Sequence, residues 1–178
     1  MSDKPTQFFT PRDDPEARGQ EKPNAIVIVL EDEATMRTAL CQGIDATPGL
    51  QAWPVEPTAD RLTELKDDAL LYGWRTTEGR DVMAILDVST PRPYGTPDFP
   101  SGFAAAAYLA RKDIPVAYST SLAQEIREHE GSSAVHIPQG TEVLQKTGNL
   151  MTTVRNAVQA ANNTLAAYRA SKAPAEEK

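Results

Sequence analysis

The sequence has little cysteine and histidine and no long hydrophobic run. It contains a single cysteine, Cys41, and two histidines, His129 and His136. One cysteine cannot form an internal disulfide, and this set of side chains leaves little material for a zinc enzyme. No apolar stretch approaches the roughly 20 residues that cross a bilayer. The polar residues 1–5 do not resemble a secretory signal. These absences predict a cytoplasmic protein.

Basic residues are outnumbered by acidic ones. The chain has 18 lysines and arginines against 25 aspartates and glutamates, for a net charge of −7. This excess argues against nucleic acid as the main partner and against attachment to an anionic membrane surface. Hydrophobic residues make up 40% and charged residues 24%, which is typical of a globular domain.

The ends of the chain differ in composition from its middle. Residues 1–23 are rich in proline and charge, which predicts a flexible N-terminal arm. Residues 171–178 are short and polar, which predicts a disordered tail. Residues 24–170 are expected to form one domain, and no separate output domain is expected after it.

Within this domain, apolar runs alternate with segments of helical spacing. Strands are expected at residues 25–30, 50–55, 82–88, 114–120 and 134–137. Helices are expected at 34–46, 58–74, 102–112, 121–130 and 141–170, the last of them extended enough to support a homodimer. Alternating strands and helices predict an α/β fold, a doubly wound five-stranded parallel sheet with helices on both faces.

Acidic and hydroxyl side chains follow the strands expected to be central. Glu31 and Asp32 follow the first strand, Asp87 follows the third, and Thr120 ends the fourth. In such a sheet, ligands bind at the carboxyl ends of the strands, where these side chains would meet. Close carboxylates repel one another, and a hard divalent cation such as Mg²⁺ removes that conflict. For a single acid such as Asp32, a role as a helix N-cap remains the alternative.

Three segments carry a resemblance to a known family. IVLEDEATMR at 28–37, LDVSTP at 86–91 and IPVAYST at 114–120 are similar, in order and spacing, to motifs of the receiver domains of two-component response regulators. The resemblance implies a CheY-like (flavodoxin-like) fold with strand order 2-1-3-4-5. It implies that Glu31, Asp32 and Asp87 bind Mg²⁺. It also implies that Asp87 is the phosphoacceptor in a phosphorelay and that Thr120 is the switch hydroxyl.

Three departures from the family pattern are expected. The family carries a lysine followed by a proline after strand five, and an aromatic residue on that strand. With strand five at 134–137, these places fall on Ile137 and Ala134, so the domain is expected to be atypical and to lack the lysine. The Pro-rich loop at 89–101 is also longer than usual, either as a new contact surface or as a tolerated insertion.

The expected function is that of a single-domain response regulator rather than an enzyme. Its partners would be a histidine kinase or phosphotransfer protein and a downstream protein target. The alternative is a pseudo-receiver that binds proteins without phosphorylation. A haloacid dehalogenase is disfavoured because the segment after Asp87 lacks a second aspartate. A flavodoxin is disfavoured because Glu31 and its acidic neighbours would repel a phosphate.

Overall fold

The computed structural model describes residues 23–57, 65, 68–88, 102–128 and 141–173. Two expected features lie wholly outside these residues: the Pro-rich loop at 89–101 and the strand at 134–137. All but the last residue of the expected N-terminal arm also lies outside them, as does about half of the expected helix at 58–74.

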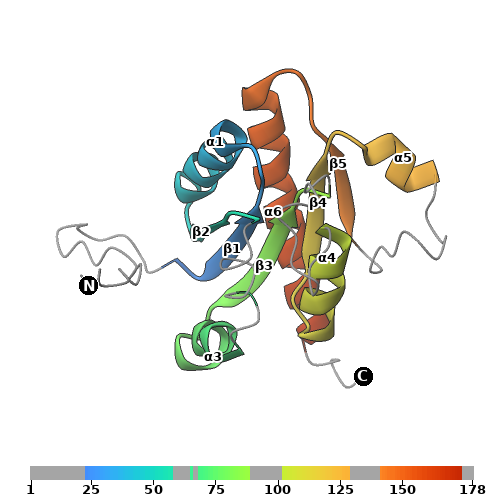
Figure 1. Cartoon of the computed structure of the whole chain (residues 1–178). Helices are drawn as coiled ribbons and strands as arrows, with labels where there is room; N and C mark the ends of the chain where they lie inside the picture. Colours follow the sequence, from blue (N-terminus) through green and yellow to red (C-terminus); the bar gives the residue numbers. More distant parts are fainter. Residues whose placement is uncertain (1–22, 58–64, 66–67, 89–101, 129–140, 174–178) are drawn as a thin grey trace, which may run out of the picture.

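One parallel sheet forms the centre of the molecule (Figure 1). Its five strands lie in the order β2-β1-β3-β4-β5, and every neighbouring pair is parallel. The strands are β1 (Ala25–Leu30), β2 (Leu50–Val55), β3 (Asp81–Leu86), β4 (Val116–Thr120) and β5 (Glu142–Gln145). The predicted doubly wound sheet and its strand order are confirmed.

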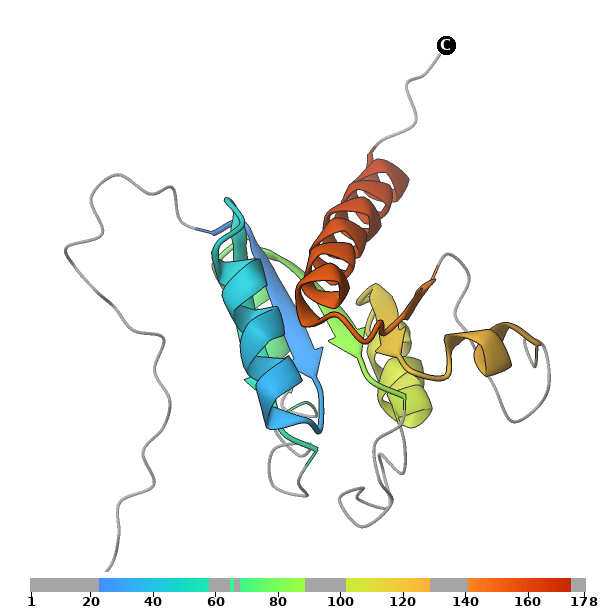
Figure 2. The same cartoon turned by 90° about the horizontal axis from the view of Figure 1, so that it is seen from above.

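Helices cover both faces of this sheet (Figures 1 and 2). The helical segments are α1 (Ala34–Asp45), α3 (Asp68–Tyr72), the π-helical turn η1 (Gly73–Thr77), α4 (Gly102–Arg111), α5 (Ala123–Glu128) and α6 (Leu150–Lys172). None of the helices in the described ranges is both long enough and apolar enough to cross a membrane.

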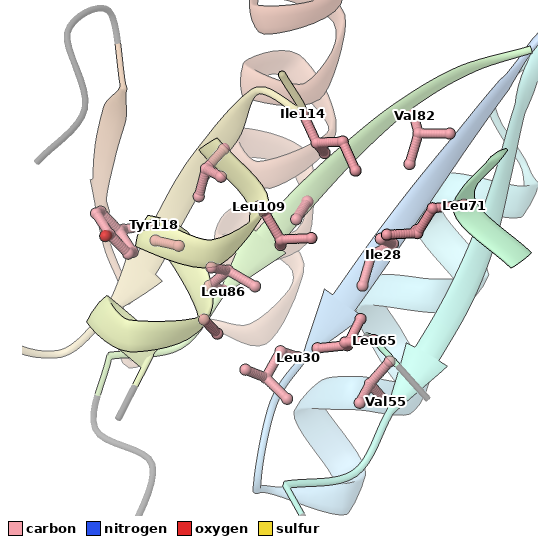
Figure 3. Close-up of a cluster of buried hydrophobic side chains, with 14 of the residues drawn as sticks. Ile28, Leu30, Val55, Leu65, Leu71, Val82, Leu86, Leu109, Ile114 and Tyr118 are labelled. Atoms are coloured by element: carbon pink, nitrogen blue, oxygen red, sulfur yellow. The ribbon is translucent and has the colours of Figure 1, made fainter. Parts of the chain in front are cut away.

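The alternation of side chains along the strands creates two hydrophobic cores. On β1, Val27 and Val29 face α1 and α6, whereas Ile28 and Leu30 face α3 and α4. All six residues of β1 are buried, because helices pack on both faces of the strand. Figure 3 shows the second core, in which Leu109 of α4 lies among strand side chains. The packing of helices on both faces holds the strands in place, and with them the strand ends that carry the acidic residues.

The fifth strand is not where the sequence analysis placed it. The strand that pairs with β4 is β5, Glu142–Gln145, with Thr120 opposite Gln145. The helix predicted from residue 141 is therefore wrong at its start, because α6 begins at Leu150 after the N-cap Asn149. Strand β5 lies at the edge of the sheet and its residues are only partly buried, so it lacks the apolar run that marks a central strand.

The end of α6 is attached to the sheet. Arg169 forms an ion pair with Asp81 at 2.5 Å, and Lys172 forms one with Asp113 at 2.7 Å. The Tyr168 hydroxyl donates to the same Asp113 carboxylate at 3.2 Å. The helix therefore continues to Lys172, two residues into the segment from 171 that was expected to form the tail.

Candidate functional site

Three carboxylates converge at the carboxyl ends of β1 and β3. Glu31 and Asp32 follow β1, Asp87 follows β3, and an oxygen of each lies within 4.8 Å of an oxygen of the others. Glu31 and Asp87 are 1% and 3% exposed, whereas Asp32 is exposed. Because β1 and β3 are hydrogen-bonded neighbours with Leu30 opposite Leu86, the residues that follow them must come together.

A lysine lies between two of these acids. Lys146 follows β5 directly, and its Nζ lies 2.7 Å from Glu31 Oε2 and 2.7 Å from Asp87 Oδ2. The expectation that Ile137 replaces this lysine is wrong, because it depended on a strand at 134–137. Ile137 itself lies outside the described residues, as does Ala134. The position three residues before the lysine is Val143, so the aromatic residue expected from the family is absent from β5.

The charges within this cluster compensate one another only in part. Burial raises the pKa of Glu31 to about 7, and the negative charge of Asp87 adds to the rise, against the hydrogen bond and charge of Lys146. Burial by itself lowers the pKa of Lys146. Hydrogen bonds and charges from Asp87 and Glu31 outweigh that effect, so the pKa of Lys146 lies above its ordinary value. Lys146 is therefore a firmly held cation.

The loop between β1 and α1 is held by an arginine. Arg37 Nη1 donates to the backbone carbonyl of Glu31 at 2.7 Å and to that of Asp32 at 3.4 Å. Its Nη2 donates to Glu56 Oε1 at 2.6 Å, just after β2. The Glu33 N–H donates in turn to Glu31 Oε1 at 3.2 Å. The two acids of the β1 end therefore project from a loop whose backbone is fixed by a neighbouring helix and strand.

A close backbone approach fixes the end of β3. Gly102, the first residue of α4, packs directly against the Asp87 carbonyl and the Val88 Cα. A Cβ at this position would collide with the Asp87 carbonyl oxygen. Only glycine allows α4 to start this close to the residue that the site depends on. The sequence analysis did not single out Gly102, because the contact crosses the long loop after Asp87.

Thr120 also lies at the carboxyl ends of the strands. It ends β4, is fully buried, and its Oγ1 accepts a hydrogen bond from the Leu122 N–H at 3.2 Å. Its backbone carbonyl accepts from the Lys146 N–H at 2.8 Å. Thr120 and Lys146 are therefore linked by a backbone hydrogen bond between β4 and the residue that follows β5.

The carboxylate cluster fits a magnesium ion. Carboxylate oxygens are the ligands that Mg²⁺ prefers, and its bonds of about 2.1 Å place opposite ligands about 4.2 Å apart. The three carboxylate oxygens lie within 4.8 Å of one another, so the cluster could hold a cation of this kind. The exposed Asp32 leaves a solvent-facing side on which water could complete the coordination.

No family model and no curated protein sequence matches the chain. Solved structures do match it. A sensor protein from Polaromonas sp. JS666 matches with a TM-score of 0.51 and 16% identity, covering 80% of this chain and 99% of that one. The response regulator domain of Thermotoga maritima CheB matches with a TM-score of 0.50 and 17% identity, covering 82% and 96%.

A third match comes from the crystal structure of the P1 domain of CheA3 in complex with CheY6 from R. sphaeroides. Its TM-score is 0.52 and its identity 14%, with coverage of 82% of this chain and 99% of that chain. These likenesses span most of the chain and agree with the observed strand order. The chain therefore has the fold of the CheY-like response regulator receiver domains.

Proposed function

We propose that this protein is a response regulator receiver that accepts a phosphoryl group on Asp87 in a two-component phosphorelay. One observation carries the proposal. Lys146, the residue after β5, contacts the same two carboxylates, Glu31 and Asp87, that would hold a magnesium ion. The arrangement would combine a carboxylate nucleophile, a cation site and an ammonium at one place, the carboxyl ends of the strands. Phosphoryl transfer needs this combination of positioning and charge neutralisation.

In the proposed reaction, a carboxylate oxygen of Asp87 attacks the phosphorus of a phosphohistidine. A phosphorus–oxygen bond forms, the phosphorus–nitrogen bond breaks, and the imidazole leaves. Glu31, Asp32 and Asp87 would hold Mg²⁺, which when bound supplies charge neutralisation at the phosphoryl oxygens. The new group adds about −1.5 to −2 units of charge. Lys146 is close enough to Asp87 to pair with that charge.

Phosphorylation would be transmitted through Thr120 and the loop after β4. The Thr120 hydroxyl, which now accepts from the Leu122 N–H, can turn to donate to a phosphoryl oxygen. That rotation removes the bond to Leu122 and frees the start of the loop. A change in this surface would be sensed by a downstream protein target. The donor would be a histidine kinase or phosphotransfer protein, in line with a matched structure that contains CheA3 P1 with CheY6.

The second candidate is a pseudo-receiver that binds proteins without being phosphorylated. The main argument for a pseudo-receiver was the expected absence of a lysine after strand five. Lys146 removes that argument, so the phosphorylated receiver is the better supported of the two.

Incubation with acetyl phosphate and Mg²⁺ distinguishes these candidates. We expect intact-mass spectrometry to detect the addition of one phosphoryl group to the native protein and none to Asp87→Asn. Beryllofluoride with Mg²⁺ should likewise shift the NMR signals of residues near Thr120 in the native protein alone. A native protein that responds to neither reagent would leave the pseudo-receiver as the function.

A further inference from the structure

The segment that joins Lys146 to α6 is held by side-chain hydroxyls. Asn149 caps the helix, its Oδ1 accepting from the Thr152 N–H at 3.0 Å. The Thr147 hydroxyl donates to the Asn149 carbonyl at 2.9 Å. These bonds bend the chain sharply from β5 into the helix, and Lys146 lies at the start of the bend.

Thr153, in the first turn of α6, contacts this segment from within the protein. It is 2% exposed. Its Oγ1 accepts from the Thr147 N–H at 3.0 Å. The same oxygen lies 3.3 Å from the Thr147 carbonyl and 3.1 Å from the Thr147 hydroxyl, to which it can donate. One threonine hydroxyl therefore serves as acceptor and donor to a single residue, Thr147.

The other side of Lys146 is held by the sheet. The Lys146 N–H donates to the Thr120 carbonyl at 2.8 Å. The backbone of Lys146 is thus held on both sides. Its own N–H is bonded to Thr120 of β4, and the N–H of the next residue, Thr147, is bonded to Thr153 of α6. A lysine ammonium is a compact charge on a flexible four-carbon stem. It stays between two carboxylates at 2.7 Å only if the base of that stem is held in place.

We propose that Thr153 is a positioning residue that fixes the Thr147 backbone and thereby holds the Lys146 ammonium between Glu31 and Asp87. Receiver domains of the family that the sequence resembles carry a proline at the place of Thr147. Proline restrains its own φ and has no N–H. Here the residue keeps its N–H, and a buried hydroxyl of α6 supplies the restraint instead.

A matched control lies on the same helix. Thr164 is also buried, at 7% exposed, and its hydroxyl has no hydrogen-bond partner among the described residues. Thr→Val at either position removes one hydroxyl at nearly constant volume. The two substitutions differ in whether that hydroxyl holds the residue after Lys146. Thr153→Ser keeps the hydroxyl and tests for rescue.

The first test observes the lysine itself, by ¹⁵N NMR of the Nζ ammonium in the native protein without phosphodonor. Lys146→Arg assigns the signal. An ammonium that is held by two carboxylates exchanges its protons with water slowly enough to be seen. We expect the signal in the native protein, Thr153→Ser and Thr164→Val, and its loss or strong broadening in Thr153→Val. A native protein without the signal, or an unchanged signal in a folded Thr153→Val, overturns the proposal.

The second test measures beryllofluoride affinity with Mg²⁺ and rests on the proposed function. Direct hydrogen-bond partners of metal ligands typically contribute 10- to 100-fold to affinity, and because Thr153 acts one step further out, through Thr147 and Lys146, we expect a loss at the low end of that range, about tenfold, for Thr153→Val. Thr164→Val should stay within about twofold of the native protein, since its hydroxyl has no hydrogen-bond partner in the described part of the chain. Equal affinities of Thr153→Val and native protein contradict the inference. Failure of the native protein to bind contradicts the proposed function and leaves the ammonium test as the measure of Thr153.

Discussion

The ammonium of Lys146 lies 2.7 Å from the carboxylate of Asp87, although the two residues are 59 positions apart in the chain. The contact is made by the two strand ends of β3 and β5, with β4 between them. Lys146 also contacts Glu31 at 2.7 Å. A magnesium ion would compete with this ammonium for the same two carboxylates.

Lys146→Met is expected to separate two properties of the site. At about pH 9, well above the pKa of Glu31, loss of the ammonium removes the cation that competes for Glu31 and Asp87, so Mg²⁺ should bind several-fold more tightly. Phosphorylation by acetyl phosphate should slow by about tenfold or more, because the phosphoryl group loses its cationic partner. Calorimetry measures the first effect and intact-mass spectrometry the second. Lys172→Met, at the far end of α6, is the control, and weaker Mg²⁺ binding in Lys146→Met would contradict the competition.

The pH dependence of magnesium binding should follow Glu31. Its pKa is raised to about 7, so a proton competes with the cation at neutral pH. We expect Mg²⁺ affinity to rise between about pH 6 and about pH 8, as Glu31 loses its proton. Calorimetric titrations across this range give the profile, and Glu31→Gln should flatten it. A native profile that is already flat would show that Glu31 is ionised throughout.

Glu31 also affects the stability of the metal-free protein. A rise in pH lowers this stability, whereas it raises the affinity for Mg²⁺. The folded pKa of Glu31 lies above its ordinary value of 4.5, so the folded state binds the proton more tightly than the unfolded chain does. The tighter binding of this proton stabilises the folded state. The stabilisation is fully present below about pH 4.5 and is lost as the pH rises through about 7. Urea unfolding without Mg²⁺ should show this loss in the native protein and much less of it in Glu31→Gln.

The central part of this site follows from the sequence because it rests on local signals. β1 and β3 are apolar runs buried on both faces, and the acids stand directly after them. Parallel pairing then brings Glu31 and Asp87 together without further information. The strand ends of a doubly wound sheet are the expected location of a site.

The lysine was missed because its place depends on an edge strand. β5 reads Glu-Val-Leu-Gln, with only two apolar residues, and no periodic pattern distinguishes it from the start of a helix. The sequence does carry one usable signal. Asn149 follows Lys146 closely and is a strong N-cap residue, which indicates that the helix begins after the lysine and not at residue 141.

Arg37→Ala should weaken magnesium binding although Arg37 is not one of the acids. Its guanidinium holds the carbonyls of Glu31 and Asp32, and Glu56 orients it. We expect about a tenfold loss of Mg²⁺ affinity by calorimetry, as for other outer partners of metal ligands. Arg80→Ala is the matched control, since Arg80 forms its ion pair with Glu78 just before β3, at the other end of the strand. If Arg37→Ala and Arg80→Ala bind Mg²⁺ with equal affinity, Arg37 contributes to the stability of the fold and not to metal binding.

Gly43 should be essential for the packing of α1 on α6. A Cβ at this position would collide with Val154 Cγ1, in the core that supports the β1 end. Helix propensity alone favours alanine over glycine by about 1 kcal/mol. Overpacking costs about 1–3 kcal/mol, so Gly43→Ala should lower the free energy of unfolding overall.

Urea unfolding of four variants, Gly43→Ala, Val154→Ala, their double variant and Gly73→Ala, tests this packing. Gly73→Ala serves as the control, because no described residue lies within 4 Å of a Cβ at Gly73, and it should be neutral or slightly stabilising. In Gly43→Ala/Val154→Ala, the removal of the valine methyl groups makes room for the new Cβ. The second substitution should therefore cost much less in the alanine background than in the native one. Additive costs would mean that Gly43 and Val154 do not meet as closely as the structure has them.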